Sequence, residues 1–235
     1  MAGENTDQSG TLYYQPLDTA SRFVRLVMAE FGIKQELQIE RVWQRRKEFV
    51  ALNPAATIPV LQLDTAVLVG TNPILGFVCE ARTDGGAPLL PSDPADRAET
   101  RRLVDWALLL LEADTTSTLV LEKALKRQIP HDQGGGAPDT QAMRVARRGI
   151  TWHLEYLEYL VRENEWLTGE RLSAADLAFA AALSSLDYLG EVPWSSHDAI
   201  KGWYARLKSR PSFAPILAER VTGVVPPAHY ENPDF

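Results

Sequence analysis

The segment from Glu40 to Glu48 places one tryptophan, Trp43, within a dense group of cationic side chains. The cations beside it are Arg41, Arg45, Arg46 and Lys47. Tryptophan and arginine dominate binding energy at protein interfaces, and a cationic cluster attracts an acidic partner. The segment therefore predicts a protein-binding surface. The alternative is that Trp43 is tucked under its own loop or serves as a dimer contact.

Two other segments carry side chains suited to binding a partner. Arg144, Arg147 and Arg148 recur at about one helical turn, so Arg144 and Arg148 share one helix face. A simply solvated face is the alternative for these arginines. The end of the chain is rich in proline and carries His229, Tyr230, Asp234 and Phe235. Because disordered tails are usually poor in aromatic residues, this tail is a second candidate partner surface, with an unstructured tail as the alternative.

Composition excludes several classes of protein. The 235 residues include 24 Lys and Arg against 31 Asp and Glu, a net charge of −7, which argues against non-specific nucleic-acid binding. Cys79 is the single cysteine, so neither an internal disulfide nor a thiolate zinc cage can form, and we expect no metal and a reducing cytoplasm. No apolar run approaches the roughly 18 residues of a membrane span, so no membrane insertion is expected. The polar start differs from a secretory signal peptide.

The first half of the chain alternates strand and helix patterns. Strands are expected at 11–16, 36–40, 57–64 and 66–70, and helices at 21–33, 44–53 and 72–82. Thr19 is the expected cap of the first helix, and Asn72 is the expected N-cap of the third. The last two strands are so close that only a hairpin can join them. The pattern therefore predicts a small α/β unit with a mixed sheet.

The second half of the chain shows helical patterns only. A stretch rich in Gly, Pro and Asp at 83–99 separates it from the first half, and helices are expected at 97–128, 140–166, 172–190 and 195–213, the last of them broken at Pro211. Ser173 and Asp176 have the spacing of a capping box, which is a structural role. The expected organisation is a flexible leader at 1–10, an α/β domain at 11–84, a linker at 85–96, an all-helical domain at 97–220 and a tail at 221–235.

Two motifs in this framework resemble those of the glutathione transferase family. They are NPAATIPVL at 53–61 and SAADLAFAAAL at 173–183, and they fall in the family's order. The resemblance covers about residues 11–220. It implies an α/β thioredoxin-like N-terminal domain followed by an all-α C-terminal bundle. It also implies that Pro59 is cis and that the backbone of Ile58 would pair with the cysteinyl part of glutathione.

The positions that bind and activate glutathione depart from the family pattern. The family's catalytic Ser or Cys falls on Asp18, whose ionised carboxylate would repel a thiolate. The acidic or amide residue and the serine that hold the γ-glutamyl group are replaced by Gly70 and Thr71. Tyr14, at the strand-end position of tyrosine-type transferases, is the remaining catalytic candidate. We therefore expect a degenerate glutathione site, comprising Asp18, Ile58, Pro59, Gly70 and Thr71.

The segments GTNP at 70–73 and PPAHYENPDF at 226–235 resemble one branch of this family, from α-proteobacteria, whose members bind the tubulin-like division protein FtsZ. This resemblance implies a homodimeric, non-enzymatic, cofactor-free scaffold. It would be recruited to the midcell division site, bind FtsZ filaments, favour their curvature and promote constriction. The alternative is a glutathione transferase that uses Tyr14 to activate glutathione for conjugation to an electrophile. A third hypothesis is an accessory protein with another partner.

Overall fold

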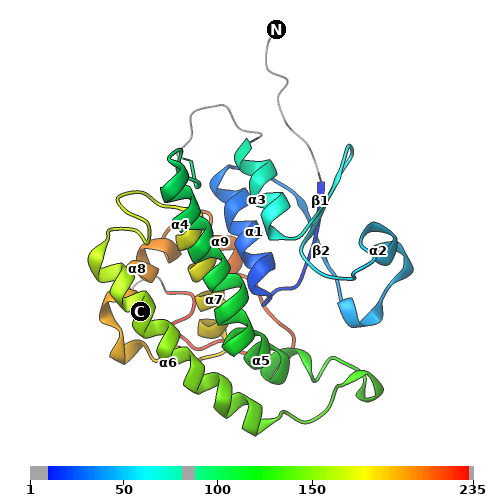
Figure 1. Ribbon diagram of the computed structural model, residues 1–235. Helices are drawn as coiled ribbons and strands as arrows, with labels where there is room; N and C mark the ends of the chain where they lie inside the picture. Colours follow the sequence, from blue (N-terminus) through cyan, green and yellow to red (C-terminus); the bar gives the residue numbers. More distant parts are fainter. Residues whose placement is uncertain (1–9, 81–87, 233–235) are drawn as a thin grey trace.

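A four-stranded mixed sheet forms the N-terminal half of the protein. The computed structural model describes residues 10–80 and 88–232, so the predicted leader lies almost entirely outside the described residues. Strands β1 (Gly10–Tyr14), β2 (Glu36–Ile39), β3 (Val60–Leu63) and β4 (Val67–Val69) lie in the order β2-β1-β3-β4 (Figure 1). β1 and β2 are parallel, and β3 is antiparallel to β1 and β4. The mixed sheet and its β3–β4 hairpin confirm the prediction.

Helix α1 (Thr19–Glu30) begins one residue after Asp18, which is its N-cap. The Asp18 carboxylate accepts a hydrogen bond from the backbone N–H of Ser21 at 2.6 Å. Thr19 is therefore the first helical residue, and its predicted role as the cap is wrong. The helix ends at Glu30 because Gly32 adopts a φ of 65° and its N–H returns to the carbonyl of Ala29 at 3.0 Å.

The other two N-terminal helices differ from the prediction at their starts. The predicted helix 44–53 is a 3₁₀ turn, η1 (Val42–Gln44), followed by α2 (Lys47–Leu52). Arg45 separates the two because its φ of 44° lies in the left-handed region, through which a right-handed helix cannot continue. Helix α3 (Thr71–Glu80) begins at Thr71, so Asn72 lies within the helix and is not its N-cap.

The C-terminal half is helical, and its described residues hold no strand longer than an isolated bridge. Its helices are α4 (Pro94–Asp105), the π-helical η2 (Trp106–Thr116), α5 (Ser117–Val120), the π-helical η3 (Leu121–Leu125), η4 (His131–Gln133), α6 (Thr140–Glu163), α7 (Ala174–Tyr188), η5 (Trp194–Ser196), α8 (Asp198–Lys208) and α9 (Ala214–Leu217). None of these described helices combines the length and apolar character that a membrane crossing requires.

Two helix boundaries in this half correct the prediction. Asp93 caps α4 by accepting the N–H of Ala95 at 2.8 Å, so α4 begins at Pro94, inside the predicted linker. The predicted helix 195–213 is α8, which begins at Asp198 and ends at Lys208, and the predicted break at Pro211 is confirmed because this proline lies in the turn between α8 and α9. The parts of the predicted linker before Pro88 lie outside the described residues.

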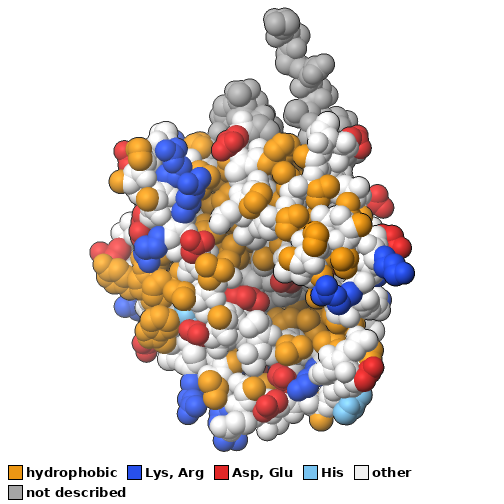
Figure 2. Space-filling view, turned by 45° about the vertical axis from the view of Figure 1, so that its right-hand side comes forward, with side chains coloured by type: hydrophobic (Ala, Val, Ile, Leu, Met, Phe, Trp, Pro, Cys, Tyr) orange, Lys and Arg blue, Asp and Glu red, His pale blue; other side chains and the backbone are white. Residues whose placement is uncertain are grey.

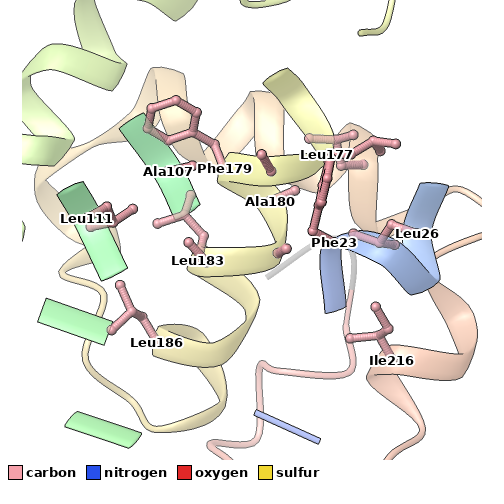
Figure 3. Close-up of a cluster of buried hydrophobic side chains, with 14 of the residues drawn as sticks. Phe23, Leu26, Ala107, Leu111, Leu177, Phe179, Ala180, Leu183, Leu186 and Ile216 are labelled. Carbon is pink, nitrogen blue, oxygen red and sulfur yellow. The ribbon is translucent and has the colours of Figure 1, made fainter. Parts of the chain in front are cut away.

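Helix α7 is the centre of the fold, and all of its residues are buried. Its start is fixed by the capping box, in which the Ser173 N–H and hydroxyl both donate to the Asp176 carboxylate at 2.9 Å, as predicted. Helix α1 packs directly on α7, with Phe23 and Leu26 facing Leu177 and Ala180 (Figure 3). The sheet and the helical half therefore share one apolar core.

Candidate functional site

The hydroxyl of Tyr14, at the end of β1, forms a hydrogen bond within the protein. It donates a hydrogen bond to Glu219 at 2.9 Å, and Glu219 forms an ion pair with Arg25 at 2.9 Å. The Arg25 guanidinium also lies 4.8 Å from the centre of the Tyr14 ring. Burial, with a contribution from the Glu219 carboxylate, raises the pKa of Tyr14 to about 12. A transferase would need this O–H to point at the glutathione sulfur.

A pair of carboxyl groups occupies the start of α1, where the family's catalytic Ser or Cys would stand. Asp18 caps the helix, and burial raises the pKa of its carboxyl. The hydroxyl of Thr19 donates to the Glu112 carboxylate of η2 at 2.5 Å. Burial, with the nearby Asp18, raises the pKa of Glu112 to about 7. The two acidic groups disfavour a thiolate here, and the Thr19 hydroxyl is already bonded to Glu112.

Glu112 is a residue that sequence reasoning missed. Its only local signal is an acidic residue at the end of the apolar run LLLLE at 108–112. The run reads as a buried helix face, and nothing in it identifies the partner. Thr19 lies 93 residues earlier in the chain, so only the packing of α1 against η2 brings the two side chains together.

The γ-glutamyl end of the family site retains its backbone and lacks its side chains. The Ile58–Pro59 peptide bond is cis, as expected, and the Pro59 carbonyl accepts the Gly70 N–H at 2.9 Å. Gly70 has a φ of 87°, a left-handed conformation that glycine adopts without strain. Thr71 follows as the first residue of α3, with no carboxylate or amide before it. Thr71 thus offers a hydroxyl at this end of the site, and Gly70 offers no side chain.

Trp43 lies in η1 and is partly exposed. The chain has six tryptophans, and four of them, Trp106, Trp166, Trp194 and Trp203, belong to the buried core or pack against it. Trp43 is not part of that core within the described residues. Beside it, Arg41, Arg45 and Lys47 are exposed.

Arg46 differs from its basic neighbours because it has an internal partner. It donates to the buried Glu40 carboxylate through Nη2 at 2.6 Å and Nε at 3.1 Å. Arg46 therefore holds the segment in place, and Trp43 and the other three cations remain as the exposed group.

Arg144, Arg147 and Arg148 of α6 are all exposed, and Arg147 differs from the other two in having a partner among the described residues. Arg147 forms a two-bond ion pair with Glu191, at 2.8 Å for each bond, and Glu191 also binds Lys123. Arg147 is thus tied to the segment after α7, but its side chain is still 49% exposed, so its contact with a partner stays a prediction. Arg144 and Arg148 are exposed on α6, in agreement with the predicted shared face.

The C-terminal tail is docked on the body of the protein. Tyr230 is completely buried; its ring meets Tyr188 edge-on at 5.0 Å, and its oxygen accepts a hydrogen bond from Arg22 at 3.2 Å. The predicted role of Tyr230 in partner contact is therefore wrong, because its aromatic ring fills a pocket between α1 and α7. His229 binds Asp187 at 2.9 Å and is partly exposed. Asp234 and Phe235 lie outside the described residues.

An aromatic patch on the helical half was not predicted. Trp106 of η2 stacks on Trp152 at 5.2 Å and lies 4.3 Å from the ring of Tyr156, both on α6. Trp152 and Tyr159 are 52% and 60% exposed, which is unusual for aromatic side chains. Val145, Trp152 and Tyr159 recur every seven residues, which is the sequence signal that could have found the patch. Hydrophobic side chains also gather on both halves of the face shown in Figure 2.

No group of three or more His, Cys, Asp or Glu side chains that could hold a metal ion occurs among residues 10–80 and 88–232. Cys79 is partly buried in α3, and burial raises the pKa of its thiol to about 11. The thiol is therefore a poor nucleophile at neutral pH.

Comparison with known proteins agrees with this geometry. The family models described as "Glutathione S-transferase, N-terminal domain" and "Glutathione S-transferase, C-terminal domain" match residues 20–81 and 131–220. FtsZ-localized protein A of Caulobacter vibrioides is 44% identical over 230 residues, which cover 96% of this chain and 98% of that protein.

Two solved structures superpose on nearly the whole chain. A crystal structure of a glutathione S-transferase from Sinorhizobium meliloti has a TM-score of 0.95 at 48% identity, and covers 97% of this chain and 100% of its own. The structure of FzlA from C. crescentus has a TM-score of 0.88 at 41% identity, with the same coverage. The first of these names is that of an enzyme, and the second names no activity. The side chains of the site therefore bear on which function this chain has.

Proposed function

This chain belongs to the glutathione S-transferase family, and from that premise we propose that it is a non-enzymatic, FtsZ-binding regulator of bacterial cell division. In this function it is recruited to the division site, binds FtsZ filaments, favours their curvature and promotes constriction. The observation that carries the proposal is the end-to-end similarity to FtsZ-localized protein A, at 44% identity. A similarity of this extent includes both domains.

The state of the glutathione site supports a non-enzymatic role without a cofactor. The Tyr14 hydroxyl is bound to Glu219, the start of α1 carries Asp18 and Glu112, and Gly70 has no side chain with which to hold the γ-glutamyl group. Each lost charge-assisted hydrogen bond costs about 1.5–3 kcal/mol of binding free energy. Two such losses weaken glutathione binding by a factor of about 150 or more.

The exposed cationic and aromatic side chains support a protein partner. Trp43, Arg144, Arg148 and His229 form the partner-contacting group in this proposal, together with Asp234 and Phe235 of the tail. Trp43 lies outside the buried core, and the two arginines are exposed on one face of α6. Such side chains are typical of binding hot spots for an acidic surface.

We also propose that the protein is a homodimer and that the aromatic patch of Trp106, Trp152, Tyr156 and Tyr159 is buried in it. Trp152, which stacks on the partly buried Trp106, is 52% exposed, and covering such an exposed aromatic side chain is favourable. A dimer presents each FtsZ-binding surface twice. Two linked contacts with a polymer raise the overall affinity without any new kind of contact.

The runner-up function is a glutathione transferase that uses Tyr14. It is favoured by the similarity to the Sinorhizobium meliloti structure, whose name is that of the enzyme. This function requires the Tyr14 hydroxyl to leave Glu219 and turn toward the ligand. A calorimetric titration with glutathione separates the two functions. We expect no binding at millimolar concentration, whereas saturable binding with conjugation of an electrophile would favour the enzyme.

Co-sedimentation with FtsZ filaments tests the proposed function directly. We expect the chain to pellet with polymerised FtsZ, and Trp43→Ala to weaken binding about 30-fold, as a hot-spot tryptophan does. The double variant Arg144→Glu/Arg148→Glu should also bind more weakly. Arg171→Glu, at another exposed arginine, is the matched control and should bind normally. Wild-type protein that stays in the supernatant would refute the proposal.

A further inference from the structure

Strand β2 lies at the edge of the sheet, and one side of its backbone faces no other strand in the described residues. Just beyond β2, the Glu40 N–H donates to the Tyr14 carbonyl at 2.9 Å. The backbone N–H and C=O groups of the even-numbered residues therefore point toward β1. Because backbone groups alternate along a strand, the N–H and C=O groups of Leu37 and Ile39 point to the free edge. These groups are a ready-made template for an additional strand.

The side chains of the same two residues are also exposed. Leu37 and Ile39 are 41% and 53% exposed, although they stand in register with Leu12 and Tyr14, which are buried. The apolar face of β1 thus continues onto β2 and is left uncovered there. A strand added beside β2 would place every second side chain next to Leu37 and Ile39 and would remove them from water.

Charge at this edge opposes the charge of the whole chain. The exposed cations around β2 and η1 are Lys34, Arg41, Arg45 and Lys47. The acidic side chains of the same stretch are fewer, because Glu40 is buried against Arg46 and only Glu36 and Glu48 are exposed. The chain as a whole carries a net charge of −7, so this edge is a local basic site on an acidic protein. A local field of this sign attracts an acidic segment.

We propose that an extended, acidic segment of a partner protein adds to the free edge of β2 as a fifth strand. Its backbone pairs with Leu37 and Ile39, its alternate apolar side chains cover those two residues, and its carboxylates meet Arg41 and Arg45. Trp43 lies four residues beyond Ile39 and contacts the end of the partner segment. The inference rests on the proposed function only in naming FtsZ as the partner.

A second copy of the chain is a poorer occupant of this edge. Pairing two copies of β2 across a two-fold axis would bring the same cations together, and like charges across an interface are repulsive. An acidic segment has the opposite charge and removes the repulsion. The charge of the edge therefore selects the acidic segment.

Amide hydrogen exchange on the full chain, measured by NMR, tests the inference. The probe is an acetylated and amidated octapeptide of alternating aspartate and valine. A lysine–valine peptide is the charge control, and an aspartate peptide with prolines in place of valines is the backbone control, because proline cannot donate to a strand. We expect the aspartate–valine peptide to slow exchange at Leu37 and Ile39 about tenfold or more. Neither control should slow it, and Arg41→Glu/Arg45→Glu should abolish the effect.

The outcomes distinguish this inference from the proposed function. If no peptide slows exchange at Leu37 and Ile39 while the chain still pellets with FtsZ, the β2 inference is overturned and the proposed function stands. If the acidic peptide slows exchange but the chain does not pellet with FtsZ, the inference stands and the partner is another protein. Equal protection by the acidic and the basic peptide would overturn the acidic specificity.

Discussion

Tyr14 donates its hydroxyl proton to Glu219, a residue 205 positions later in the chain, at a distance of 2.9 Å. Glu219 lies just beyond α9 and also forms an ion pair with Arg25 of α1. The side chain at the strand-end position of the tyrosine-type enzymes therefore joins the sheet to the end of the helical half. This hydrogen bond gives Tyr14, the catalytic candidate of the sequence, a structural contact.

The Tyr14 contact predicts the behaviour of the Tyr14→Phe variant. Removing the hydroxyl deletes one hydrogen bond to a carboxylate that keeps its ion pair with Arg25, so the free energy of unfolding should fall by about 1–2 kcal/mol. FtsZ co-sedimentation should be unchanged. Urea denaturation of the variant beside the wild type measures the first effect. Loss of a glutathione-conjugating activity in Tyr14→Phe would contradict the structural role.

The raised pKa of Glu112 predicts a pH dependence of stability. The folded pKa is about 7 and the unfolded value is near that of a free glutamate, so between these values the folded state holds the proton that the unfolded state has lost. Glu112 therefore destabilises the fold progressively as pH rises from about 4.5 to 7, and the cost is constant above that range.

The Glu112→Gln variant isolates this effect, because its amide oxygen still accepts from Thr19 and carries no charge. Its unfolding free energy should exceed that of the wild type by an amount that grows from pH 4.5 to 7, to about 3 kcal/mol. Guanidinium denaturation at a series of pH values measures the difference. A difference that shrinks as pH rises across this interval would show that the pKa of Glu112 is not raised.

The docked tail predicts that Tyr230 contributes to stability. Tyr230 is completely buried, so Tyr230→Ala should lower the free energy of unfolding by about 3–5 kcal/mol, as other large-to-small aromatic substitutions do. Tyr230→Phe should cost less, about 1–2 kcal/mol, because the ring stays buried and only the hydroxyl is lost, which accepts from Arg22 and donates to the Ile216 carbonyl. Thermal unfolding of both variants measures this order. A Tyr230→Ala variant as stable as the wild type would mean that the tail is not docked.

The aromatic patch predicts the oligomeric state. Trp152→Glu places a charge beside Trp106 and Tyr156 on an exposed helix face, so the fold should tolerate it and a dimer that buries the patch should not. We expect the wild type to sediment as a dimer and the variant as a monomer in analytical ultracentrifugation. Glu155→Gln, at a neighbouring exposed position of α6, is the control. A wild-type monomer, or a variant that remains dimeric, would place the interface elsewhere.

The strand and helix patterns of the sequence were sufficient to predict the mixed sheet, the helical half and the capping box of Ser173 and Asp176. These features depend on residues close together in the chain, such as alternating apolar side chains or a hydroxyl three positions before a carboxylate. Helix boundaries were less accurate. The cap at Asp18 and the left-handed Arg45 are set by single backbone angles that composition does not show.

The chemistry of the site depended on contacts that the sequence does not contain. Trp43 and the α6 arginines are visible as residue types, but only the structure shows that Arg46 and Arg147 have internal partners. The sequence by itself determined the fold family and showed that position 70 offers no side chain to a ligand, since glycine lacks one in any conformation. Only the tertiary structure decided the environments of Tyr14, Glu112 and Tyr230, because burial and partners distant in the chain set their pKa values and exposure.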